Sequence, residues 1–143
     1  RNTKGLSMTK LAIFAAVAAL ASTPVFAEGD VEAGEKAFKK CKACHMIASE
    51  DEVLFKGGKT GPNLYGIIGR GMGTQEDFKY GSGLIAAQEA GLVWDEESLA
   101  GYISDPSGWL KEVLDDPKAK SKMTYKHKKG AEDMSAYLAT AGS

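Results

Sequence analysis

The chain has 143 residues, with 18 lysines and arginines against 19 aspartates and glutamates. The net charge is −1 at neutral pH, and this balance gives no support to a nucleic-acid-binding role, which depends on a basic surface. A chain of this length is long enough for one domain.

Residues 1–27 are predicted to comprise upstream residues and a cleaved secretory signal peptide. A basic start precedes the apolar run at 11–21, and the small-x-small sequence VFA follows it. Eleven apolar residues are too few to cross about 30 Å of hydrocarbon, which argues against a retained anchor. We expect Met8 to be the natural start and cleavage to follow Ala27. The product would be one soluble exported domain, residues 28–143, with 15 basic and 19 acidic residues and a net charge of −4.

The segment DVEAGEKAFKKC, residues 30–41, is predicted to form a helix with Asp30 as its N-cap. Helical spacing places four residues on one face, namely Val31, Gly34, Phe38 and Cys41. Glycine inside a helix costs about 1 kcal/mol relative to alanine. Gly34 therefore indicates that another backbone approaches the helix closely at this point.

Residues 46–83 are rich in glycine and irregular, and no segment of the chain shows a convincing strand pattern. So long a loop is unusual in a compact domain, and it is expected here to wrap a buried ligand. The predicted architecture is therefore all-helical, with short helices and long loops.

Three further helices are predicted after this loop. One begins near Asp95, with acidic residues in its first turn, and stops at Asp105 because Pro106 disfavours helix in the residue before it. Pro106 suits the first turn of the next helix, PSGWLKEVL. The last helix, AEDMSAYLAT at 131–140, has an apolar face that is expected to pack against the helix at 30–41.

Residues 41–45 read CKACH, and three kinds of chemistry compete for this motif. A catalytic dithiol belongs at a helix N-terminus, whereas these cysteines end a helical stretch, and the βαβ pattern of a thioredoxin-like fold is missing. A structural zinc site needs four ligands, and only His45 and the distant His127 could supplement the cysteines. C-x-x-C-H supplies two thiols for the vinyl groups of haem and an imidazole for its iron. Together with the export signal, it is interpreted as a covalent haem attachment site.

The sixth ligand of the iron is open at this stage. Met46 adjoins the motif histidine and cannot reach the opposite face of the ring, and Met134 fits the core face of the last helix. Met72, Met123 and His127 remain as candidates. A thioether favours ferrous iron and raises the potential, whereas His127 would give a bis-imidazole iron.

Four segments in sequence order resemble the class I cytochromes c: CKACH, KTGPNLYG, the W-x-x-E-x-L-x-x-Y-I-x-D-P run at 94–106, and KSKMTYK. Over 29–138 the chain is similar to the soluble periplasmic carriers of the c2 kind. The resemblance implies a small, all-α cytochrome c fold wrapped around one covalently attached haem c. It further implies two attachment residues and two axial iron ligands, respectively Cys41 and Cys44, and His45 and Met123.

The resemblance also assigns a haem environment. The carbonyl of Pro62 would accept a hydrogen bond from His45, and the hydroxyl of Tyr102 would lie near the methionine sulfur. Four residues match positions that bond to the haem propionates: Arg70, Tyr80, Trp94 and Ser121. Without the resemblance, the tryptophan and Tyr102 would be interpreted as core aromatics and the arginine as a solvated loop charge. Tyr125 departs from the phenylalanine that is usual in the family.

Two protein ligands on the iron would leave no position for a substrate, so electron transfer is favoured over catalysis. Residues 118–129 contain six lysines and no acidic residue, whereas residues 89–116 contain eight acidic residues and one lysine. Five more lysines lie near the attachment site and its following loop: Lys39, Lys40, Lys42, Lys56 and Lys59. A positive haem edge that steers acidic partners is therefore expected.

By resemblance, the expected protein is a monomeric periplasmic shuttle that takes electrons from a quinol–cytochrome c reductase. Its acceptor would be a terminal oxidase, a photosynthetic reaction centre or another reductase. A haem enzyme or gas sensor with a labile sixth ligand is the alternative, and a subunit of a respiratory or sulfur-oxidising complex is a third hypothesis. Neither nucleic-acid binding nor membrane insertion is expected.

Overall fold

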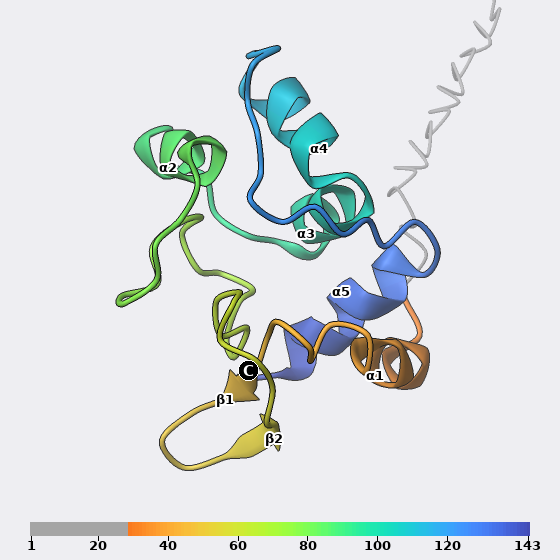
Figure 1. The fold of residues 1–143 in the computed structure, drawn as a ribbon. Coiled ribbons are helices and arrows are strands. Elements are labelled where there is room, and N and C mark those ends of the chain that lie inside the picture. The colour runs from red at the N-terminus through yellow and green to blue at the C-terminus, as the bar shows by residue number, and fades with distance from the viewer. Residues whose placement is uncertain (1–28) are drawn as a thin grey trace, which may run out of the picture.

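The computed structural model describes residues 29–143, so the predicted leader and its cleavage after Ala27 lie outside the described residues. No helix in the described range is long and apolar enough to cross a bilayer. Five helices and two short strands follow one another along this range (Figure 1): α1 (Val31–Phe38), β1 (Ile47–Ala48), β2 (Val53–Phe55), α2 (Ser82–Glu89), α3 (Glu96–Ser104), α4 (Pro106–Val113) and α5 (Ala131–Thr140).

Helices α1 and α5, the first and last helices of the described chain, pack against each other (Figure 1). Phe38 is fully buried, and its ring centroid lies 6.0 Å from that of Tyr137. A Cβ on Gly34 would lie 2.0 Å from the carbonyl oxygen of Asp133 and 2.7 Å from Cβ of Tyr137. The expected pairing of first and last helices is thus confirmed, and Gly34 permits it.

The predicted apolar face of the first helix is wider than the observed one. Val31 is 41% exposed, and α1 ends at Phe38, so Cys41 follows in turns outside the helix. The contacts of α1 with helix α5 include Gly34 and Phe38, whereas the side chain of Val31 is exposed.

The predicted limits of α3 and the predicted start of α4 are confirmed, because local capping groups define them, and α4 ends at Val113, one residue before the predicted end. Asp95 and Ser98 form a capping box: Ser98 N donates to Asp95 Oδ1 (2.7 Å), and Asp95 N donates to Ser98 Oγ (2.9 Å). Hydrogen bonds to the carboxyl of Asp95 from the backbone and the side chain of Ser98 lower its pKa. Asp105 ends α3 and caps α4, accepting from Gly108 N at 3.2 Å, and Pro106 occupies the first turn of α4. A sharp corner between the two helices results.

The all-helical class is confirmed, but the structure adds two short strands that the sequence pattern did not predict. β1 and β2 form an antiparallel hairpin that pairs Ile47 with Phe55 and Ala48 with Val53. Strands of two and three residues are too short to show the alternation by which a strand is recognised. A contact distant in sequence helps to hold them, because Asn63 Nδ2 donates to the carbonyl of Ala48 (2.6 Å).

Helix α2 was not predicted, and it begins inside the segment that was expected to be irregular. Its N-cap is Gly81, which has no side-chain acceptor, and its first turn has no acidic residue. Its buried Gly83 packs so closely that an added Cβ would lie 2.5 Å from the carbonyl oxygen of Lys120 and 2.7 Å from Leu110. Tertiary packing rather than a local start signal therefore accounts for this helix.

Backbone hydrogen bonds hold the irregular segment at 56–80 against the chain that leads into α3. Trp94 N donates to the carbonyl of Arg70 (2.9 Å), and Met72 N donates to the carbonyl of Leu92 (2.8 Å). Gly71 and Val93 form an isolated bridge between the same two stretches. The loop is thereby fixed along the wall of the cavity described next.

Candidate functional site

Helices α1, α2, α3 and α5 and the long loops enclose a cavity of about 800 Å³. Much of its wall is apolar and includes Phe38, Leu64, Ile67, Leu84, Leu99, Ile103, Met134 and Leu138. Native interiors leave few voids larger than a water molecule. A space this large and this apolar therefore fits a bulky prosthetic group.

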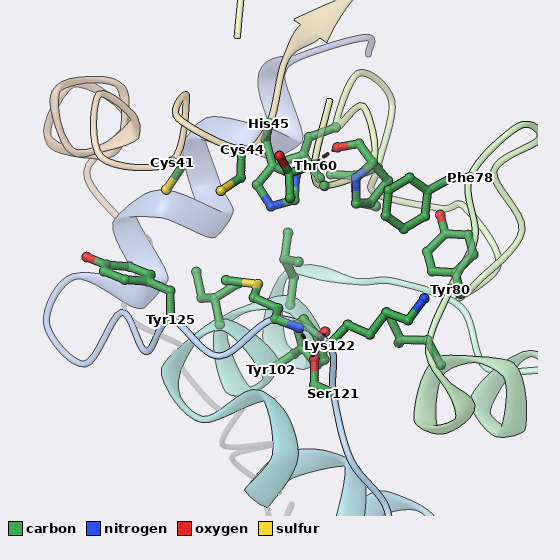
Figure 2. A pocket seen from close by; sticks show the side chains of 18 of the residues that line it. Cys41, Cys44, His45, Thr60, Phe78, Tyr80, Tyr102, Ser121, Lys122 and Tyr125 are labelled. Atoms are coloured by element: carbon green, nitrogen blue, oxygen red, sulfur yellow. Dashed lines mark hydrogen bonds between the residues drawn. The ribbon is translucent and has the colours of Figure 1, made fainter. Parts of the chain in front are cut away.

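Cys41, Cys44 and His45 stand together on one wall of this cavity (Figure 2). After α1 the chain continues in tight turns, with His45 N donating to the carbonyl of Cys41 at 3.0 Å. Both cysteines are free thiols. Burial, followed by the proximity of Cys44, raises the pKa of the Cys41 thiol. Catalytic dithiols require the opposite shift, so the geometry disfavours that chemistry.

Two neighbours fix the imidazole of His45. Its Nδ1–H donates to the carbonyl oxygen of Pro62 at 2.7 Å, which leaves Nε2 with a free lone pair. A Cβ on Gly61 would lie 2.3 Å from Cε1 of the ring, so only glycine fits there. Burial lowers the pKa of His45, and the bond to Pro62 opposes the shift. The ring is therefore held neutral and oriented, as a metal ligand must be.

Met123, Tyr102 and Ser121 line the cavity as well, and Figure 2 shows Tyr102 and Ser121 across from His45. The hydroxyls of Tyr102 and Ser121 lie 2.6 Å apart. Ser121 Oγ also accepts from Met123 N at 3.0 Å. Burial raises the pKa of Tyr102, so its hydroxyl stays protonated. Ser121 thus links the hydroxyl of Tyr102 to the backbone of Met123 by two hydrogen bonds.

Of the four residues matched to propionate-bonding positions, Tyr80, Trp94 and Ser121 line the cavity, and Arg70 does not. The Arg70 guanidinium donates to the carbonyl oxygens of Asn63 (2.9 Å) and Tyr65 (2.5 Å). It therefore braces the loop behind the wall. Its role toward a propionate stays a prediction.

The other candidate iron ligands occupy different surroundings. Met72 is only 2% exposed and packs in the core away from the cavity lining. Met134 is equally buried and contributes to the wall from α5, in keeping with a packing role. His127 is 7% exposed and also lines the cavity.

Sequence reasoning missed three supports of the site. Gly61 accommodates the His45 ring, Ser107 Oγ accepts from Ser121 N at 3.0 Å, and Lys126 Nζ pairs with Asp105 at 2.7 Å. Gly61 alone had a sequence signal, because a glycine in this loop is consistent with the close approach of another group to the backbone. The other two contacts join segments 14 and 21 residues apart and have no local signal.

The donors around the cavity fit a haem rather than a bare metal ion. Within residues 29–143, no group of three or more His, Cys, Asp or Glu side chains could hold a metal. The cavity instead offers two thiols, one oriented imidazole and one thioether in an apolar wall. Haem iron takes this His/Met pair of axial ligands in electron-transfer proteins.

No family model matches the chain, but individual proteins do. It is similar to cytochrome c-551 of Roseobacter denitrificans, at 55% identity over 134 residues, covering 93% of this chain and 96% of that one. Similarity to cytochrome c2 of Rhodobacter capsulatus is 52% over 128 residues, covering 88% and 93%. The structure of that cytochrome c2 aligns with a TM-score of 0.76 and 51% identity over 78% of this chain and 97% of that one. Ferric cytochrome c-550 from Paracoccus versutus aligns with a TM-score of 0.77 and 48% identity, over 81% and 100%.

Proposed function

The chain belongs to the class I cytochromes c, and within them to the c2 type, and on this premise we propose that it is a soluble periplasmic one-electron carrier with a His/Met-ligated haem. Members of this family are electron carriers with covalently attached haem c, which is the cofactor of this chain too. The haem supplies a reversible one-electron change at its iron. One observation carries the proposal: Cys41, Cys44, His45 and Met123 all line one apolar cavity.

Cys41 and Cys44 are the proposed attachment residues. Each thiol would add across one vinyl double bond, its sulfur joining one carbon and its hydrogen the other, so the step needs no oxidant and releases nothing. Their shared wall with His45 supports this assignment (Figure 2). Two covalent tethers next to the proximal ligand would keep the group from leaving the site.

His45 and Met123 are the proposed axial ligands. The Pro62 carbonyl accepts the Nδ1–H of His45, which would leave Nε2 free to bind the iron. Ser121 restrains the backbone of Met123. With both positions filled by protein, the iron would have no place for a substrate, as a carrier rather than an enzyme requires. Little atomic movement would accompany a change of redox state.

The first test of this ligation is the visible spectrum of the oxidised protein. We expect the weak far-red band that marks methionine bound to ferric haem iron, and its loss in Met123→Ala. Met72→Ala, which removes a buried methionine away from the cavity, is the matched control and should keep the band. A high-spin spectrum of the unmodified protein, with ready uptake of carbon monoxide on reduction, would instead indicate an enzyme or gas sensor with an open sixth site.

The proposed donor is a quinol–cytochrome c reductase, and the proposed acceptor is an oxidase, a reaction centre or another reductase. Five lysines line the cavity and support docking there: Lys40, Lys59, Lys79, Lys120 and Lys122. Lys126 contributes less, because Asp105 balances its charge at 2.7 Å. A positive surface of this kind accelerates encounter with an acidic partner and loses its effect as salt is added.

Charge reversal tests this docking surface. Lys120→Glu should slow reduction by a quinol–cytochrome c reductase roughly tenfold at low salt, with the difference shrinking as ionic strength rises. Lys111→Glu makes the same change of charge on α4, away from the cavity lining, and should have little effect. Stopped-flow reduction rates across a salt series provide the measurement. If both variants were slowed equally, the change in net charge would explain the effect, and docking at the cavity would be contradicted.

A further inference from the structure

His127 is the one buried side chain of the described residues whose polar atom has no hydrogen-bond partner. Its Nε2 is buried and unpaired, although its ring lines the cavity. The ring stacks on Tyr125 with 6.3 Å between centroids, and Figure 2 shows Tyr125 beside the cavity near Cys41. Buried polar atoms in native proteins are nearly always satisfied. The unpaired imidazole nitrogen of His127 in this cavity therefore suggests that it has a binding partner when the cavity holds haem.

The segment that carries Met123 and His127 is anchored at its two ends. At one end, Ser121 contacts Tyr102 and Ser107. At the other, His127 N donates to the carbonyl of Ile103 at 2.7 Å. Between these anchors, the backbone N–H groups of residues 124–126 make no hydrogen bond to another backbone group of the described chain. Apart from the exposed ion pair of Lys126 with Asp105 (2.7 Å), these residues have few internal bonds, which implies low local stability. The middle can therefore move while His127 stays beside the cavity.

We propose that His127 is a reserve axial ligand, which binds the iron through Nε2 whenever the thioether of Met123 is displaced. The inference rests on the proposed His45/Met123 ligation and adds a second ligation state of the same site. Imidazole nitrogen is an established ligand of haem iron. Because methionine favours the ferrous form, the exchange would lower the potential and withdraw the carrier from its ordinary electron flow.

Two lysines of the same segment are the competing ligands. Lys120 and Lys122 line the cavity, but both are exposed, and Lys122 Nζ already donates to the carbonyl of Lys79 at 2.9 Å. A lysine must shed a proton and its hydration before it can bind iron. The buried imidazole of His127 has already lost its water and has no competing hydrogen bond. His127 is therefore favoured over both lysines.

The experiment compares Met123→Ala with the double variant Met123→Ala/His127→Leu, both carrying haem. We expect the single variant to lose the far-red band yet remain low-spin by visible and electron paramagnetic resonance spectra. The double variant should become high-spin and bind carbon monoxide when reduced. A high-spin single variant, or a double variant that stays low-spin, would overturn the proposal; the latter would assign the position to another ligand such as lysine.

His127→Leu alone separates this proposal from the proposed function. It should retain the far-red band, because Met123 remains the resident ligand. If the unmodified protein itself lacked the band and its low-spin spectrum were lost in His127→Leu, His127 would be the resident ligand, which would contradict the His45/Met123 assignment itself. If His127→Leu keeps the band and Met123→Ala is high-spin, the proposed reserve role of His127 is refuted and the proposed His45/Met123 ligation is not.

A second measurement covers the case in which the methionine variant does not fold. Urea is added to the unmodified protein and to His127→Leu until the far-red band disappears while the helical circular dichroism persists. The unmodified protein should then show a low-spin bis-imidazole signal that His127→Leu lacks. The same signal in both proteins would refute the proposal.

Discussion

A chain produced without haem should lack the fold described above. The cavity measures about 800 Å³, and core substitutions cost about 24 cal/mol per Å³ of cavity left behind. Extended to this cavity, the figure gives an upper bound on the order of 20 kcal/mol. Small domains are stable by only about 5–15 kcal/mol. Far-ultraviolet circular dichroism of haem-free chain should therefore show little helix and no cooperative thermal transition.

The Cys41→Ala/Cys44→Ala variant shows whether the fold depends on the covalent bonds to haem or only on the presence of haem in the cavity. It should yield haem to acid and organic solvent, whereas either single variant keeps one thioether and retains its haem on a denaturing gel. Ala43→Ser changes one of the two residues between the cysteines and should retain haem as the unmodified protein does. Native helicity and cooperative unfolding in haem-free chain would contradict the cavity argument.

Gly34→Ala should destabilise the haem-loaded protein by about 3 kcal/mol, at the upper end of what overpacking a core usually costs. The new Cβ would lie 2.0 Å from the carbonyl oxygen of Asp133 and 2.7 Å from Cβ of Tyr137. Neither atom is the far end of a flexible side chain, so α1 and α5 would have to separate. The helix-propensity gain from glycine to alanine, about 1 kcal/mol, offsets only part of this cost. The midpoint of guanidinium unfolding, followed at the haem absorbance, provides the measurement.

Lys36→Ala is the matched control for this substitution. It lies on the exposed side of α1, and surface changes of this kind usually stay within about 0.5 kcal/mol. A Gly34→Ala protein as stable as this control would mean that the helices can separate at no cost. It would remove the packing explanation for the glycine.

Local chemistry made several parts of the fold predictable. Both ends of α3 and the start of α4 follow from Asp95, Asp105 and Pro106, because capping and proline act on the nearest few residues. Helix α2 and the β1–β2 hairpin escaped prediction. The first has glycine at its N-cap, and the second has strands too short to show a period.

The candidate site divides in the same way. By itself, the sequence determined the CKACH motif, the all-helical class and the close approach at Gly34, since each depends on residue identity at short spacing. Its resemblance to a family supplied Met123, which is 78 residues from His45.

Only the tertiary structure decided what surrounds these groups. It placed Pro62 and Gly61 against His45, joined Tyr102 to the backbone of Met123 through Ser121, and left Nε2 of His127 buried without a partner. Such contacts join segments that no local pattern relates, and they form only when the loops close around the cavity. These contacts are stabilised by hydrogen bonding and burial, and both depend on which residues are neighbours in space rather than in sequence.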